Sequence, residues 1–183
     1  MNFQPTPIQG LWEITTTPRF DARGSLTRLY CADEFEEVTP GLRFVQVNHS
    51  ITAKQGTVRG MHFQRAPALE AKLIRCLRGS VFDVIVDVRE NSPTFGSWHA
   101  LELNDANQRQ VLIPPGCAHG FQSLADDSQL LYQHSAAYAP YCEDGLAFDD
   151  VQVGIRWPLP ITDVSDRDRG FKRIGHGFEG VRI

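Results

Sequence analysis

Apolar residues along this chain recur in short runs separated by Gly, Pro and Asp, and no run keeps a helical period for long. Strands at such spacing, without intervening long helices, indicate an antiparallel sandwich or barrel rather than strand–helix–strand units. We therefore predict an all-β fold with strands over 44–50, 57–64, 72–77, 81–88, 98–103, 110–113 and 129–134.

The segments before and after these strands, residues 10–41 and 170–183, have less regular patterns. Two short strands are expected over 10–15 and 24–30, with a turn between them. One short helix is expected over 31–38, because acidic residues favour a helix N-terminus and Pro40-Gly41 ends the pattern. The glycine-rich tail over 170–183 is expected to be loosely held.

Alternation within the strands predicts which side chains share a face. Lys72 shares a face with Ile74 and Cys76, so its ammonium is expected to point into the barrel. Gln46 and Asn48 also share a face and offer two amides that can read a base or sugar edge. The alternative for this amide pair is the exposed polar face of a half-buried strand.

Composition limits the class of protein. The 183 residues suit one domain over 1–183, and a net charge of −4 with a pI near 5.8 provides no basic field for nucleic acid or an anionic membrane. No run approaches the roughly 18 apolar residues of a membrane helix, and the first residues lack signal-peptide character. Four widely spaced cysteines form no C-x-x-C pair, so we expect a cytoplasmic protein with reduced thiols.

The segment Arg59-Gly60-Met61-His62-Phe63-Gln64 places a permanent cation and a titratable base three residues apart. A regular strand would send Arg59 and His62 to opposite faces, but a bulge at Gly60 would let both converge. A surface arginine beside a hydrogen-bonded core histidine is the simpler alternative for this pair alone.

A second segment, Ile113-Pro-Pro-Gly-Cys-Ala-His119-Gly-Phe, delivers His119 at the start of the next strand, with Cys117 assigned to packing. Gly56 before His62, together with Pro114-x-Gly116-x-x-His119, is similar to the paired motifs of cupin barrels. Gln64 stands where a metal-binding cupin carries a second histidine, and no glutamate follows at ligand spacing. Two histidines alone make a weak divalent site, so we expect no metal.

Longer stretches resemble the dTDP-4-dehydrorhamnose 3,5-epimerase family over most of residues 8–170. The resemblance rests on motifs that occur in the family's order: Arg59-Gly-Met-His62-Phe-Gln, Lys72-Leu-Ile-Arg-Cys, Val81-Phe-Asp-Val-Ile-Val-Asp-Val-Arg, Ser92-Pro-Thr-Phe-Gly96, Arg109-Gln-Val-Leu-Ile-Pro-Pro-Gly-Cys-Ala-His119-Gly-Phe, Leu131-Tyr132, Gly154-Ile-Arg-Trp-Pro158 and Ser165-Asp-Arg-Asp168. It implies a metal-free, cofactor-independent cupin jelly roll that acts as a homodimer on a nucleotide-linked 4-keto-6-deoxyhexose, with residues 8–30 at the dimer interface.

The resemblance also implies a role for each site residue. His62 falls on the general base, Asp168 on the carboxylate that orients it, Tyr132 on the opposing acid, and Lys72 on the cation beside the keto oxygen. Substrate-binding positions fall on Arg23, Arg28, Gln46, Asn48, Arg59, His119, Tyr138 and Glu143, some of them supplied across the dimer. The chemistry fits, because removing a proton next to a ketone requires a positioned base and a donor to the enolate oxygen.

One departure concerns the nucleotide. Arg28 stands where the family commonly has a glutamate that contacts the nucleotide, so a CDP- or GDP-linked sugar is an open alternative. A single-centre epimerase and a 3,4-ketoisomerase on the same barrel are also compatible with the sequence. A non-catalytic nucleotide-sugar-binding module would keep Arg59 and His119 without requiring His62, Asp168 and Tyr132 together.

Overall fold

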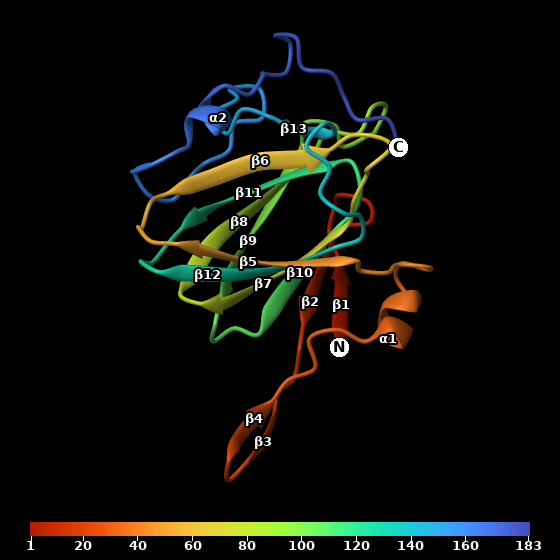
Figure 1. Cartoon of the computed structure of the whole chain (residues 1–183), viewed down its shortest axis with the longest axis vertical. Coiled ribbons are helices and arrows are strands. Elements are labelled where there is room, and N and C mark those ends of the chain that lie inside the picture. The colour runs from red at the N-terminus through yellow and green to blue at the C-terminus, as the bar shows by residue number, and fades with distance from the viewer.

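A computed structural model describes residues 1–183 as two antiparallel sheets that face each other (Figure 1). The first sheet has six strands, which in spatial order are β1 (Asn2–Pro5), β2 (Trp12–Thr15), β10 (Arg109–Ile113), β7 (Lys72–Arg78), β12 (Ser128–His134) and β5 (Gln46–Thr52). The second has five, which are β13 (Glu143–Gly145), β6 (Val58–Gln64), β11 (Cys117–Ser123), β8 (Ser80–Asp87) and β9 (Trp98–Asn104). The all-β jelly-roll expectation is confirmed.

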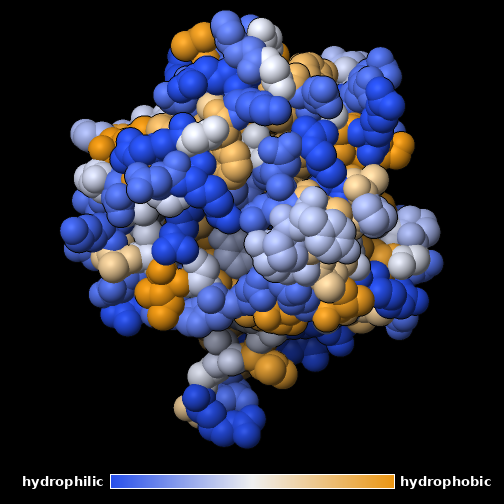
Figure 2. All heavy atoms as spheres, turned by 45° about the horizontal axis from the view of Figure 1, so that its top comes forward, coloured by the Kyte–Doolittle hydropathy of each residue, from blue (hydrophilic) through white to orange (hydrophobic).

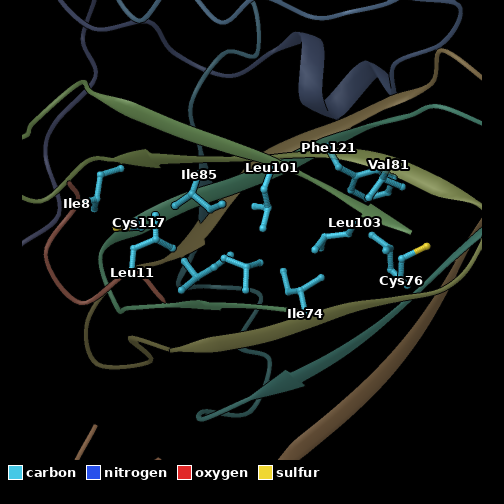
Figure 3. Close-up of a cluster of buried hydrophobic side chains, with 13 residues drawn as sticks. Ile8, Leu11, Ile74, Cys76, Val81, Ile85, Leu101, Leu103, Cys117 and Phe121 are labelled. Atoms are coloured by element: carbon cyan, nitrogen blue, oxygen red, sulfur yellow. The ribbon is translucent and has the colours of Figure 1, made fainter. Parts of the chain in front are cut away.

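The core fills the space between the two sheets (Figure 3). Its largest cluster has 13 buried residues and takes Ile74 and Val111 from the first sheet and Ile85, Leu103 and Phe121 from the second. Because side chains alternate along a strand, each sheet directs one apolar face inward. Near β5 and β6, the residues that face the space between the sheets are polar instead, among them Gln46, Asn48 and His62.

Helical structure is limited to two short elements. Helix α1 (Ala32–Glu36) packs Phe35 against the aromatic rings of Phe3, Tyr30 and Phe44 beside the first sheet. Helix α2 (Asp166–Arg169) lies over β6 of the second sheet (Figure 1). Neither helix has the length and apolar character that crossing a membrane requires.

A hairpin of β3 (Arg19–Asp21) and β4 (Gly24–Leu26) projects from the body of the molecule (Figures 1 and 2). Its two large apolar side chains, Phe20 and Leu26, are 78% and 75% exposed. The strand expected over 24–30 therefore ends at Leu26. Strands as short as β1, β3 and β13, with three or four residues each, contain too little alternation to be predicted from sequence.

The expectation of a loosely held tail over 170–183 differs from the structure. Val181 is 1% exposed and pairs with Arg89, while the Arg65 guanidinium donates to the backbone carbonyls of Glu179 and Gly180. Phe171 packs edge-on against the His62 ring. Glycine content alone suggested mobility, but these long-range contacts hold the segment and depend on the folded arrangement.

Candidate active site

A cavity of about 700 Å³ opens where the β7–β12–β5 edge of the first sheet faces the β11–β6–β13 edge of the second. The nine predicted site residues that line it are Gln46, Asn48, Arg59, His62, Lys72, His119, Tyr132, Tyr138 and Glu143. Asp168 reaches it through His62.

Strand register explains the floor of this cavity. Lys72 of β7 pairs with His134 of β12, and His134 pairs in turn with Gln46 of β5. Tyr132 lies two residues from His134 on the same face of β12 and pairs with Asn48 of β5. The expectation that Lys72 faces inward is confirmed, and Gln46 and Asn48, which were expected to share a face, both line the cavity.

A bulge in β6 brings Arg59 and His62 to the same cavity. Across the β6–β11 pair, His62 lies opposite His119 and Arg59 lies opposite Phe121, so three steps on β6 match two on β11. Gly60 provides this extra step at φ 140°, and a Cβ there would be 2.5 Å from the Cα atom of Gly120. The predicted bulge is therefore confirmed, and only glycine fits it.

His62 and Asp168 form a hydrogen-bonded pair, with 2.9 Å between Nε2 and Oδ1. The other carboxylate oxygen accepts the Gly60 backbone N–H at 3.0 Å, and Ser165 caps the short helix by accepting the Asp168 N–H. Burial would raise the pKa of Asp168, but the hydrogen bonds from His62 and Gly60 outweigh it and lower the pKa to about 2. Asp168 is therefore a carboxylate at neutral pH.

The tautomer of His62 follows from its neighbours. Nε2 is also 3.1 Å from Arg167 Nη2, a donor that could bond only to an unprotonated Nε2. The shorter, charge-assisted contact with buried Asp168 favours a proton on Nε2. This arrangement leaves Nδ1 as the nitrogen able to accept a proton.

Lys72 is held in a polar corner of the cavity floor. Its side chain is 8% exposed, and Nζ lies 3.2 Å from Glu70 Oε1 and 3.3 Å from the His62 carbonyl oxygen. A buried ammonium needs such partners, because an unpaired buried charge is strongly unfavourable. The cation is thus fixed close to the strand that carries His62.

Tyr132 and His119 meet edge to face, with ring centroids 5.9 Å apart. Burial raises the pKa of Tyr132 well above its ordinary value, and the Asp83 carboxylate adds to the effect, so the phenol keeps its proton at neutral pH. His119 Nε2 lies 2.9 Å from Asp83 Oδ2, while burial lowers the pKa of His119 below its ordinary value. The cavity therefore contains a protonated Tyr132 phenol beside a His119 ring that Asp83 holds in place.

The far end of the cavity has a chain of amide and carboxylate contacts. Gln46 donates to Asn48 Oδ1 at 3.2 Å and accepts the Tyr138 backbone N–H at 2.9 Å. The Tyr138 hydroxyl donates to Glu143 at 2.9 Å. Arg59 lies farther along β5, with Nη2 3.3 Å from the Ile51 carbonyl oxygen.

Arg23 and Arg28 are not brought to this cavity. Arg23 lies at the hairpin turn with a 90% exposed side chain that pairs with Asp21 at 2.6 Å. Arg28 follows the hairpin and pairs with Glu34 at 2.8 Å. Within one chain, these two predicted site residues are separate from the other ten.

Several residues that line the cavity were not predicted from the sequence, among them Glu70, His134 and Arg167. Strand alternation could have found His134, which lies two residues beyond Tyr132, and Glu70 lies two residues before Lys72. Arg167 lies beside Asp168 and donates to Glu143 at 2.9 Å and 3.0 Å. Alternating charges such as those of residues 165–169 are typical of a solvated turn, so no local pattern marks Arg167 as a cavity residue.

Gln64, which stands where a metal-binding cupin carries a second histidine, has a structural role in this protein. Gln64 is buried, donates to the carbonyls of Ala68 and Ala137, and accepts the Ala139 backbone N–H at 2.7 Å. It joins the loop after β6 to the loop that carries Tyr138. No group of three or more His, Cys, Asp or Glu side chains is arranged to hold a metal ion.

Comparison with known proteins gives a consistent result. The family model for dTDP-4-dehydrorhamnose 3,5-epimerase matches residues 5–175. A dTDP-4-dehydrorhamnose 3-epimerase of Streptomyces niveus is 40% identical over 92% of this chain and 82% of its own length. A dTDP-4-dehydrorhamnose 3,5-epimerase of Methanothermobacter thermautotrophicus is 39% identical over 94% of both chains.

The fold comparison agrees with the sequence comparison. The crystal structure of a dTDP-6-deoxy-D-glucose-3,5-epimerase of Legionella pneumophila, in complex with dTDP-4-keto-L-rhamnose, matches with a TM-score of 0.89 and 36% identity. The match covers 95% of this chain and 93% of that one.

Proposed function

This chain belongs to the dTDP-4-dehydrorhamnose 3,5-epimerase family, and we propose that it inverts carbon centres beside the 4-keto group of a dTDP-linked 6-deoxyhexose. The observation that carries the proposal is the meeting of His62–Asp168, Lys72 and Tyr132 around one cavity. These groups are a base, a cation and a proton donor, which is the set that inversion through an enolate requires.

His62 is the base in this proposal. Its Nδ1 takes the proton from the carbon next to the ketone, and the electron pair of the broken C–H bond moves to form the enolate. Asp168 holds the Nε2–H and stabilises the imidazolium that forms. The low pKa of Asp168 suits this role, because the carboxylate stays ionised throughout.

Lys72 supplies the positive charge beside the enolate oxygen. A fixed ammonium in a partly dehydrated cavity stabilises developing negative charge more strongly than water does. Its proximity to the His62 backbone, at 3.3 Å, supports a geometry in which base and cation act on adjacent atoms of one substrate.

Tyr132 returns the proton from the other side. His62 is on β6 of the second sheet and Tyr132 is on β12 of the first, so a sugar ring between the sheets meets the base on one face and the acid on the other. Reprotonation from the opposite face inverts the carbon. The His62 imidazolium then releases its proton to solvent, and the Tyr132 phenolate takes up a proton from solvent. Both residues are thereby ready for the next turnover.

The remaining cavity residues orient the substrate. Arg59 and His119, joined by Arg167, are placed for the diphosphate and sugar, since guanidinium groups bind phosphate oxygens well. The nucleotide would bind at the end of the cavity that is lined by Gln46, Asn48, Tyr138 and Glu143. Such binding supplies orientation, which can account for much of a rate enhancement.

The proposal includes a homodimer in which the β3–β4 hairpin reaches the partner's cavity. The exposed Phe20 and Leu26, and the distance of Arg23 and Arg28 from the cavity of their own chain, support this arrangement. Arg23→Ala should then raise KM without changing the monomer fold, and sedimentation should give a dimer. A monomer with full activity would contradict it. A cytoplasmic location is also part of the proposal, because all four cysteines are free.

A single-centre 3-epimerase is the second candidate. The Streptomyces niveus relative carries that name and is as similar to this chain as the 3,5-epimerases are. Both reactions use the same base and acid, so the outcome depends on how the sugar sits in the cavity. A 3,4-ketoisomerase and a non-catalytic binding module are further outcomes that the experiment below separates.

Proton NMR in deuterium oxide, with dTDP-4-keto-6-deoxyglucose as substrate, tests the function directly. Exchange at both C3 and C5 with formation of the inverted sugar supports a 3,5-epimerase, and exchange at C3 alone makes the protein a 3-epimerase. Migration of the keto group would identify a ketoisomerase. No exchange with this sugar or its CDP- and GDP-linked counterparts would contradict catalysis and favour the binding module.

A further inference from the structure

Glu70 is a buried acid within a cavity that must accept an anionic substrate. Its side chain is 7% exposed, and its two oxygens have different partners, Lys72 Nζ at 3.2 Å and His134 Nδ1 at 2.8 Å. Burial would raise the pKa of Glu70, but the hydrogen bond from His134 and the charge of Lys72 outweigh it and keep the pKa below its ordinary value. Glu70 is thus an ionised carboxylate between two groups.

His134 is the outer member of this group. Because Nδ1 faces a carboxylate, it carries the ring proton, and Nε2 is left as an acceptor 3.4 Å from the Asn48 amide nitrogen. The ring also stacks on Tyr132 at 6.0 Å with an interplanar angle of 14°. His134 is therefore fixed on three sides.

These contacts form one continuous line from Lys72 through Glu70, His134 and Asn48 to Gln46. The line begins at Lys72, the first residue of β7, passes through Glu70 in the preceding loop, and crosses β12 and β5. Each step pairs a donor with an acceptor, so neighbouring side chains in the line hold one another in place. The Glu70 carboxylate is thereby kept beside the Lys72 ammonium.

We propose that Glu70 and His134 act as a positioning pair that holds the Lys72 ammonium in its catalytic direction. The inference rests on the proposed function, in which Lys72 faces the enolate oxygen. A lysine has four flexible side-chain bonds and no planar fork, so its direction depends on its partners. Glu70 provides the anionic partner, and the Nδ1–H group of His134 fixes the carboxylate plane. Neither residue needs to touch the substrate.

Two conservative variants and one disruptive variant test the pair. Glu70→Gln keeps the shape and removes the charge. His134→Phe keeps the stacking on Tyr132 and removes the donor, whereas His134→Asn offers an amide N–H near the place of Nδ1. We expect kcat to fall about 10- to 100-fold in Glu70→Gln and His134→Phe, with little change in KM, because a small misplacement costs about that much. His134→Asn should recover most of the activity.

The pH profile separates positioning from a structural role. The titratable groups around Lys72 are Glu70, His134 across the β7–β12 pair, and His62 and His119 from the facing sheet. Without the Glu70 carboxylate, the charged ammonium loses stabilisation, so activity should fall off at a lower alkaline pH in Glu70→Gln than in the unmodified protein. Glu37→Gln and His176→Asn, which change exposed residues outside the cavity, serve as matched controls.

Binding of dTDP, measured by calorimetry, should be the same in all these variants. Unchanged kcat and an unchanged pH profile in folded Glu70→Gln would overturn the inference. So would equal losses in His134→Asn and His134→Phe, because they would show that the imidazole itself is required. If Glu70→Gln does not fold, the two His134 variants decide. Failure of the proposed function is distinguishable, since the unmodified protein would then show no deuterium exchange at all.

Discussion

The Nε2 atom of His62 lies 2.9 Å from Oδ1 of Asp168, although 106 residues separate them in sequence. The Gly60 backbone N–H donates to the same carboxylate, so the bulge in β6 serves both partners. One local irregularity thereby directs the imidazole into the cavity and anchors the acid that orients it.

Loss of this pair should abolish proton abstraction. His62→Ala should show no deuterium exchange at C3 or C5, and Asp168→Asn should lower kcat by about 10²- to 10⁴-fold, because the amide does not stabilise the imidazolium. Exchange is followed by proton NMR. Asp166→Asn, an exposed change on the same helix, is the control and should retain activity. Normal exchange in His62→Ala would remove His62 as the base.

Tyr132→Phe should separate abstraction from inversion. Without the phenol, we expect inverted product to form about 10²- to 10⁴-fold more slowly, while some solvent exchange at the original configuration persists. Abstraction by His62 does not need the hydroxyl. The measurement compares exchange and product signals in one NMR time course. Equal loss of both would refute this division of labour between the two sheets.

Gly60→Ala should destabilise the fold by about 3 kcal/mol or more, because the new Cβ would lie 2.5 Å from the Cα atom of Gly120. Urea unfolding followed by circular dichroism measures the change. Gly24→Ala is the matched control, since Gly24 has φ 135° but nothing within 4 Å of the added Cβ. We expect about 1 kcal/mol there, and equal losses at both sites would refute the steric argument.

Acid should weaken the fold through Asp87. Burial would raise the pKa of Asp87, but hydrogen bonds from Arg89, Ser92 and Thr94 lower it to about 2. The pKa is therefore lower in the folded than in the unfolded chain, where it is about 3.9. The ionised Asp87 therefore stabilises the folded state by on the order of 2 kcal/mol. This contribution is fully present above the pKa of the unfolded chain and is lost as the pH falls through the folded pKa of about 2.

Asp87→Asn isolates this effect. The free energy of unfolding of the variant should lie below that of the unmodified protein at pH 6, and the gap should narrow markedly by pH 2.5. Urea titrations at the two pH values provide the test. A gap that stays constant would show that the Asp87 charge is not responsible.

The sequence by itself determined the all-β class, most strands of both sheets, the inward face of β7 and the shared face of Gln46 and Asn48 on β5. Period-two alternation is a local property that the backbone enforces wherever a strand forms. It also pointed to Gly60 as the place for a bulge, because two side chains three residues apart on a strand can share a cavity only through an extra residue.

Only the tertiary structure decided which residues meet. Register across β7, β12 and β5 brings Lys72, His134 and Gln46 into one row, and the return of α2 over β6 brings Asp168 to His62. The contact of Glu70 with His134, and the packed tail over 170–183, depend on contacts between segments far apart in sequence. No local pattern encodes such contacts, because they arise from how the two sheets and their loops pack together.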